Sequence, residues 1–193
     1  LDAVITCLAE HGYARTTTEL VATTAKVSRG TMLHRFPTKQ ALIEAGIDYA
    51  FFRRMENYLA DMGQLTEKQR VEENLGIRTS WTHYFTKEYR AYLDLHVAAR
   101  TDAELARVFI PRAKRYDRIW RQEIARAFPE WGTDQALLDR SCEFARATVE
   151  GLALNADIWD DPQHQETLLQ FVAETLILLR DQKLSFPEPE TIA

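Results

Sequence analysis

Helical periodicity is the feature that most constrains the fold of this chain. Apolar residues recur at three- and four-residue spacing in each of its long segments. The breaks between these segments are short, as at Thr101-Asp102, Pro129 and Pro162. Only seven Gly and six Pro occur among the 193 residues, while Ala, Leu, Glu, Arg and Gln recur throughout, which favours helix over strand. We therefore expect an all-α protein of about nine helices.

The first part of the chain predicts three short helices. The first ends at Gly12, a candidate left-handed cap. The second has N-cap hydroxyls at residues 16–18 and cannot extend far beyond Thr24. The third has Ser28 as its N-cap, and Pro37 stops it after about two turns.

A long fourth helix is predicted over residues 38–62, with Thr38 as its cap and Gly63 at its end. Its apolar stripe contains Leu42, Ala45, Tyr49, Phe52, Met55, Leu59 and Met62. Further helices are predicted over residues 67–86, 88–100, 103–128, 134–159 and 162–184. Pro111 should either kink its helix or start a new one, and the tail from Phe186 to Ala193 should be irregular.

The pattern predicts two domains joined by the long helix. Residues 1–45 form a helix-turn-helix domain, helix 38–62 links the two parts, and residues 46–193 form a helical domain for effector binding and dimerisation. The start of the chain lacks the features of a signal peptide, and no uncharged apolar run reaches the roughly 18 residues of a membrane span. We expect a cytoplasmic location.

Charge is unevenly distributed along the chain, although its formal net value is -5. Between Leu20 and Ile43 every charged residue is basic, whereas acidic residues outnumber basic ones beyond Gly63. The basic residues of this segment are Lys26, Arg29, Arg35 and Lys39. A local cationic surface of this kind suits nucleic acid despite the acidic total.

Two short helices joined by a turn have the geometry of a helix-turn-helix, whose second helix enters the major groove of DNA. Here that helix spans residues 28–36, with Met32, Leu33 and Phe36 on its buried side. The opposite side offers side chains suited to base edges and phosphates, namely Arg29, Gly30, Thr31, His34 and Arg35. Further phosphate contacts are predicted from Thr17, Thr18, Lys26, Ser28, Thr38 and Lys39. The alternative is an αα-corner of a helical bundle with a solvated basic face.

A family resemblance supports the DNA-binding interpretation. The residues that carry it are Gly12-Tyr13, Thr16-Thr17-Thr18, Leu20-Val21-Ala22, Val27-Ser28-Arg29-Gly30-Thr31-Met32, His34-Arg35-Phe36-Pro37, Lys39 and Ala41-Leu42. Over about residues 3–50 the chain resembles the DNA-binding domain of the TetR (TetR/AcrR) family. The resemblance implies a sequence-specific transcription regulator, usually a repressor that a small-molecule effector releases from double-stranded operator DNA.

Two residues depart from the family pattern. Leu33 stands where the family usually has Tyr, whose hydroxyl commonly reaches a phosphate. Lys26 stands where it usually has Gly in the turn, a substitution that costs about 1 kcal/mol if the turn requires positive φ. The additional cation beside the DNA would compensate for this.

The apolar pattern of the last two predicted helices indicates a homodimer. Residues of helix 134–159 at alternating four- and three-residue spacing form a seam that packs on another helix, and the final helix is apolar on nearly every side. The predicted interface residues are Leu138, Cys142, Ala145, Val149, Leu152, Ala156, Phe171 and Leu178. The alternative for the final helix is a core position within one subunit.

Aromatic residues gather between these two regions and suggest an apolar effector pocket. The predicted lining is Trp81, Phe85, Tyr92, His96, Phe109 and Trp120. Plain core packing is the alternative for each of them. A basic stretch from Arg112 to Arg126 could indicate an anionic effector, although such a run is more often a solvated face.

No motif of an enzyme is present: the chain has no phosphate loop, GxSxG, HExxH or dinucleotide glycine motif. The five His and two Cys lack metal-ligand spacing, so no metal or cofactor is expected. Cys7 and Cys142 fit buried thiols better than a redox pair. The other class of function left open is a helical interaction module whose helix-turn-helix no longer reads DNA.

Overall fold

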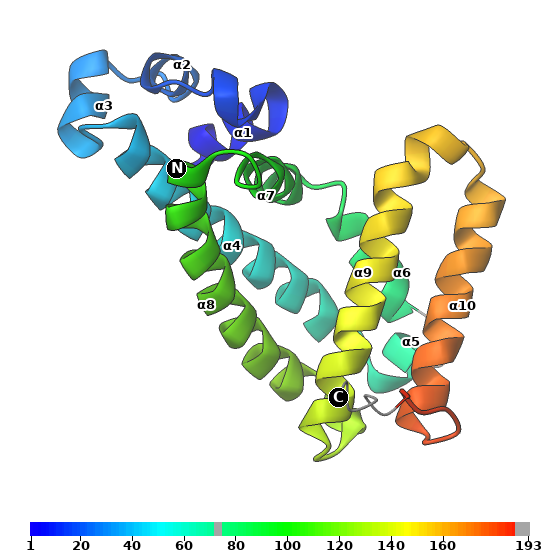
Figure 1. Cartoon of the computed structure of the whole chain (residues 1–193). Helices are drawn as coiled ribbons and strands as arrows, with labels where there is room; N and C mark the ends of the chain where they lie inside the picture. Colours follow the sequence, from blue (N-terminus) through cyan, green and yellow to red (C-terminus); the bar gives the residue numbers. More distant parts are fainter. Residues whose placement is uncertain (72–74, 188–193) are drawn as a thin grey trace, which may run out of the picture. The chain divides into compact units, whose positions relative to one another are not determined.

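The computed structural model describes residues 1–71 and 75–187, and every regular element in these ranges is helical (Figure 1). The expected all-α fold is confirmed. The elements are α1 (Asp2–Arg15), α2 (Thr18–Thr24), α3 (Arg29–Arg35), α4 (Lys39–Gly63), α5 (Glu67–Val71), α6 (Leu75–His83), α7 (Lys87–Ala98), α8 (Ala103–Ala127), a 3₁₀ turn η1 (Pro129–Trp131), α9 (Gln135–Trp159) and α10 (Pro162–Arg180).

These helices form two compact units. The first unit contains Leu1–Asp61 and Thr82–Glu123, and therefore holds α1, α2, α3, α7 and most of α4 and α8. The second contains Met62–Trp81 and Ile124–Ala193, with α5, α9, α10 and most of α6. The units are defined by packing, so the functional division at residue 45 stays a prediction.

Side-chain caps define the ends of the early helices as the sequence predicts. Thr17, Ser28 and Thr38 each accept a hydrogen bond from the backbone N–H three residues further on, at 3.0 to 3.1 Å. These caps begin α2, α3 and α4, because they satisfy N–H groups that lack a partner within the helix. α2 ends at Thr24, and α3 ends before Pro37.

Gly12 interrupts α1 with a backbone conformation that glycine favours. Its φ is 77° and its ψ is 167°, a region that is essentially restricted to glycine. The expected positive φ is present, but the chain makes a further helical turn to Arg15 instead of ending there. A Cβ atom at Gly12 would lie 3.1 Å from Asp94 Oδ1, so the glycine also lets α1 approach α7.

The long helix α4 buries part of the predicted stripe, including Leu42 and Met62, but its buried face is shifted from the predicted one at Phe52. Its buried apolar residues in the first unit are Leu42, Ile43, Ile47, Ala50 and Phe51, whereas Phe52 is 56% exposed. The close approach of α1 and α4 orients this face, since a Cβ atom at Gly46 would lie 2.7 Å from Val4 Cγ1. The prediction for Phe52 was wrong because adjacent aromatic residues satisfy helical spacing almost equally well.

The helix expected to reach residue 86 ends earlier in the structure, and one of the two alternatives at Pro111 is excluded. The segment 67–86 forms α5 and α6, with residues 72–74 outside the described ranges. α6 ends at His83, because the Thr86 hydroxyl accepts the Tyr89 N–H at 3.3 Å and starts α7. No new helix begins at Pro111, since α8 continues through it. The expected irregular tail lies outside the described residues from position 188 onward.

The second unit contains a helical hairpin and a shielded ion pair. Asp160, in the left-handed conformation with φ 42°, ends α9, and Asp161 caps α10, which lies beside α9 (Figure 1). Arg70 pairs with Glu130 at 3.3 Å, where the glutamate side chain is only 3% exposed.

None of the helices in the described ranges combines the length and the apolar character needed to cross a bilayer.

We expect Gly12→Ala to destabilise the protein by about 1–3 kcal/mol, because an L side chain is strained at this φ and its Cβ would press on Asp94. Gly30→Ala is the matched control, since Gly30 is helical and its nearest neighbour would be Ser28 Oγ at 3.7 Å. The control should change stability by no more than about 1 kcal/mol. Denaturant midpoints measure both effects, and equal midpoints for the two variants would contradict this account of Gly12.

Candidate nucleic-acid interface and aromatic cluster

One face of α3 is fully open to solvent in the first unit. Arg29, Gly30, Thr31, His34 and Arg35 are all exposed. Met32 is buried at 7% exposure and anchors the opposite side of the helix. α3 lies beside α2 (Figure 1), as the second helix of a helix-turn-helix does. The geometry therefore brings together the side chains expected to contact DNA bases.

The turn between α2 and α3 contains a strained residue. Lys26 has a φ of 56°, which costs an L residue roughly 1–2 kcal/mol relative to glycine. Its side chain is exposed. The positive φ that the sequence comparison anticipated at this turn is present.

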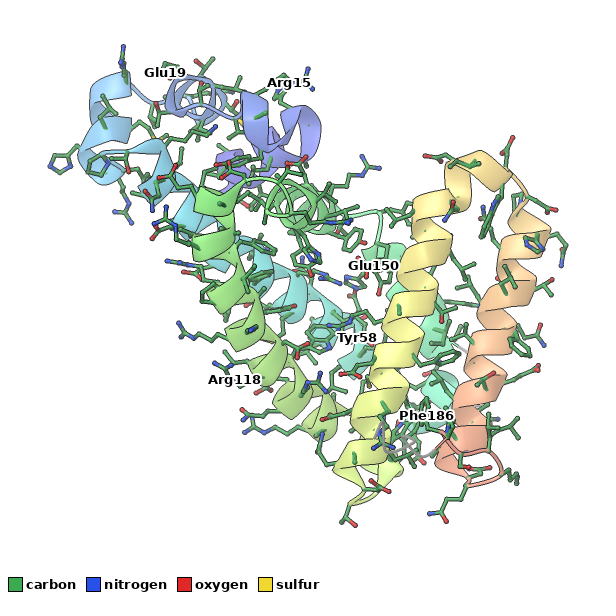
Figure 2. The ribbon with its side chains drawn as sticks, in the orientation of Figure 1. Arg15, Glu19, Tyr58, Arg118, Glu150 and Phe186 are labelled. Carbon is green, nitrogen blue, oxygen red and sulfur yellow. The ribbon has the colours of Figure 1, made fainter. Side chains whose placement is uncertain are left out.

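Arg29 is held by an acidic neighbour from α2. Its guanidinium lies 3.3 Å from the Glu19 carboxylate, and both side chains are well exposed. Several groups lower the pKa of Glu19, first its own backbone N–H and then the Thr18 hydroxyl, with Arg29 contributing less. Glu19, labelled on Figure 2, therefore keeps its negative charge beside the cationic face at neutral pH.

Lys39 is half-buried, and its ammonium contacts other groups of the protein. Its Nζ donates to the Tyr13 carbonyl oxygen at 3.2 Å and lies 4.6 Å from the centre of the Tyr13 ring. The Tyr13 backbone N–H donates to Asp94 on α7. Burial raises the pKa of the Tyr13 hydroxyl, and the Asp102 carboxylate raises it further. Of the predicted phosphate contacts, Lys39 is thus the one whose ammonium is already engaged.

Aromatic rings join α4, α7 and α8 within the first unit. We call the following set the aromatic cluster: Phe51, Tyr58, His83, Tyr84, Tyr89, Tyr92, His96, Phe109, Tyr116 and Trp120. Phe51 occupies its centre, stacked on Tyr116 at 4.6 Å and tilted against Phe109 at 5.7 Å. Each such pair adds about 0.5–1.5 kcal/mol beyond burial of its area.

Four of the six residues predicted to line an effector pocket belong to the aromatic cluster. Tyr92, His96 and Phe109 contact one another at 5.6 to 5.9 Å. Trp120 packs on Tyr58, which Figure 2 labels on the second half of α4, at 4.9 Å. Phe85 is 41% exposed, and Trp81 is half-buried in the second unit.

The contribution of α4 to this cluster was missed from the sequence. Phe51 and Tyr58 each lie one residue before a position of the predicted apolar stripe, Phe52 and Leu59. The tandem Phe51-Phe52 was the available signal. It shows that at least one ring must turn inward, but not which.

The residues predicted for a subunit interface differ in their exposure, and the interface itself stays a prediction. Leu138, Val149 and Leu152 are buried at 1% to 5% exposure within the chain itself, so they are unavailable to a partner. Cys142, Ala145 and Ala156 are half-buried. Phe171 and Leu178 are exposed, as an interface requires. Trp159, which continues the spacing of the predicted seam, is also exposed, and so are Leu154 and Ile158, which lie off that seam.

The chain resembles known proteins in its N-terminal sequence and in its fold. The family model of "Bacterial regulatory proteins, tetR family" matches residues 1–45. A transcriptional regulator from Rhodococcus has a similar structure, with 20% identity, 91% of this chain and 92% of that chain covered, and a TM-score of 0.64. No curated protein matches the chain in sequence.

Two other solved structures have the same fold. The fatty acid degradation regulator FadR from Bacillus halodurans has 18% identity over 93% of this chain and 91% of its own, with a TM-score of 0.61. A TetR transcription regulator from Haloarcula marismortui has 20% identity over 94% of both chains, with a TM-score of 0.58. At these identities the likeness is one of fold.

The exposed recognition helix, its caps and this fold define a helix-turn-helix transcription regulator. Residues 1–45 match the DNA-binding domain of the TetR family, as the sequence motifs predicted.

We expect Lys26→Gly to raise stability and weaken DNA binding at the same time. Relief of the positive φ should stabilise the fold by about 1 kcal/mol. Loss of one cation should reduce the slope of log affinity against log salt by about 1 if Lys26 meets a phosphate. Thermal unfolding and DNA binding across a salt series test the two effects. Lys26→Asn is the control that tolerates positive φ without restoring charge.

Proposed function

We propose that this protein is a homodimeric transcription repressor, released from its operator by a small-molecule effector. The observation that carries the proposal is the open face of α3, where cationic and hydrogen-bonding side chains are presented opposite a buried anchor. The family match over residues 1–45 supports DNA as the partner. The matching solved structures are described as regulators or binding proteins, which favours this class over an enzyme.

DNA recognition divides between base contacts and phosphate contacts. Arg29 and Arg35 suit bidentate pairing with guanine, and the Thr31 methyl suits thymine. Thr17, Ser28 and Thr38 accept backbone hydrogen bonds through their oxygen atoms. The Thr38 hydroxyl proton is open to a phosphate oxygen. The Thr17 hydroxyl also hydrogen-bonds to the Glu19 carboxylate, and Ser28 shares a 2.9 Å hydrogen bond with Thr31. Lys26 adds a phosphate contact beside them.

A dimer supplies the two recognition helices that two half-sites require. We assign its interface to the exposed apolar side chains of α9 and α10, namely Leu154, Ile158, Trp159, Phe171 and Leu178. Exposed apolar groups on adjacent helices are typical of surfaces that a partner covers. This assignment replaces the buried leucine and valine positions of the predicted seam.

Effector binding within the aromatic cluster has a short physical route to the helix-turn-helix. Arg112 of α8 contacts Glu44 at 2.9 Å and Asp48 at 3.4 Å, both on α4. Asp94 of α7 accepts the Tyr13 N–H, at the end of α1. A ligand that separates the rings of α4, α7 and α8 would therefore shift the helices that carry α2 and α3.

Arg29→Ala and Arg35→Ala should each weaken binding to DNA from the region upstream of the protein's own gene by about 1–3 kcal/mol, or roughly 5- to 150-fold. Binding to unrelated DNA should change much less, so the specificity ratio falls. Arg118→Ala is the matched control, because Arg118 is exposed on the outward side of α8 (Figure 2). Anisotropy titrations with both DNAs measure these ratios.

Glu19→Gln should act in the opposite direction in the same titrations. It removes a negative charge near the DNA phosphates and frees Arg29, so binding to unrelated DNA should tighten by about fivefold. If neither arginine variant changes the specificity ratio, the helix-turn-helix does not read DNA, and the proposed function fails.

Ile158→Asp and Phe171→Asp should each convert the dimer to a monomer in light-scattering measurements. These side chains are 75% and 65% exposed, so a charge there should leave the folded subunit intact while it disrupts an apolar interface. Val97→Asp, at a 55% exposed site in the first unit, is the control that should remain dimeric. A dimer that persists in both α10 and α9 variants would contradict this interface.

A further inference from the structure

The arginine at position 54 has an unusual environment in the first unit. Its guanidinium carbon lies 4.9 Å from the centre of the Tyr89 ring, 5.0 Å from that of Tyr92 and 5.9 Å from that of Tyr84. Tyr89 is 2% exposed and Tyr84 is 9% exposed, so the rings form a rigid wall. Arg54 itself is half-buried on α4.

The neighbouring arginines find carboxylate partners, and Arg54 does not. Arg53 pairs with Glu56 at 2.7 Å, and Arg112 pairs with Glu44 at 2.9 Å. Across residues 1–71 and 75–187 no ion pair joins Arg54 to a carboxylate, including Glu88, which is buried on α7 beside Tyr89.

The acidic group on the same face of α4 is occupied elsewhere. Asp61 lies seven residues beyond Arg54, which is roughly 10 Å along the helix axis. It contacts His83 Nε2 at 2.9 Å, and His83 packs edge-on against Tyr58. Within the described ranges, the positive charge of Arg54 therefore has aromatic faces around it and no carboxylate within 4.0 Å.

This arrangement leaves the hydrogen-bonding edges of the guanidinium available. A guanidinium that contacts rings keeps five N–H donors in its own plane, in a fork that matches a carboxylate. A partly buried cation is costly without an anion, and cation–π contacts offset only part of that cost. A ligand carboxylate would complete the site, with its apolar body against the rings of the aromatic cluster.

We propose that Arg54 and the tyrosines 84, 89 and 92 form the binding site for the carboxylate of an anionic effector with an aromatic or aliphatic body. The inference rests on the proposed ligand-responsive function and specifies the chemical class of its ligand. Neutral or cationic compounds of the same shape lack the group that pairs with the guanidinium.

The test uses the full chain and matched pairs of acids and amides. Benzoate, phenylacetate and octanoate are titrated beside benzamide, phenylacetamide and octanamide, by calorimetry and by tryptophan fluorescence, to which Trp120 of the cluster contributes. At least one acid should bind with a dissociation constant below about 1 mM, and its amide should bind at least about tenfold more weakly.

Arg54→Gln should lose this preference for the acid, and Arg54→Lys should keep part of it, because an ammonium retains the charge but not the planar fork. Arg118→Gln, at an exposed site on α8, should bind as the unmodified protein does. Circular dichroism and thermal unfolding confirm that each variant is folded.

The outcomes separate this inference from the proposed function. Equal binding of acid and amide, unchanged binding by Arg54→Gln, or no binding of any of the three acids would overturn the carboxylate site. Acid binding that depends on Arg54 but leaves DNA affinity unchanged would support the site and contradict release of DNA by an effector.

Discussion

The backbone at Gly12-Tyr13 is the constraint on which the first unit depends. The positive φ of Gly12 turns the chain so that the Tyr13 N–H reaches Asp94, while the Tyr13 carbonyl and ring receive Lys39. One short segment thus ties α1 to both α7 and α4. The helix-turn-helix is fixed to the helices that carry the aromatic cluster because these contacts converge on adjacent backbone groups.

The helix caps could be predicted from the sequence, whereas the choice of which helix face is buried could not. Thr17, Ser28 and Thr38 predicted the helix starts, because capping depends on residues three apart. The prediction that Phe52 is buried was wrong, since Phe51 and Phe52 both fit a helical stripe and contacts with other helices decide which of them turns inward. The interface on α9 stays a prediction for a related reason: periodicity identifies a face that packs on a helix, but not whether that helix belongs to the same subunit.

The two charged neighbourhoods of the first unit differ in how their cations are neutralised. Arg29 shares the charge of Glu19 in solvent, where the pair is weak and easily exchanged for a phosphate. Arg54 lies among tyrosine rings, whose cation–π contacts stabilise its charge but do not neutralise it. Both arrangements suit the anions proposed above. The solvent-exposed Arg29 suits the DNA polyanion, and Arg54, which lies among aromatic rings, suits a small acid with an apolar body. Arg29 was predicted from the sequence, whereas Arg54 did not stand out from its spacing, because the tyrosine rings around it come from another part of the chain.

The double contact of Arg112 restricts where α4 can bend. Glu44 and Asp48 lie one helical turn apart, and the same guanidinium holds both of them. These contacts join one turn of α4 to the part of α8 around Arg112. The half of α4 beyond Asp48 contains Phe51, Arg54 and Tyr58. If an effector changes the direction of α4, as proposed, the joined turn resists bending, and the change arises beside the aromatic rings.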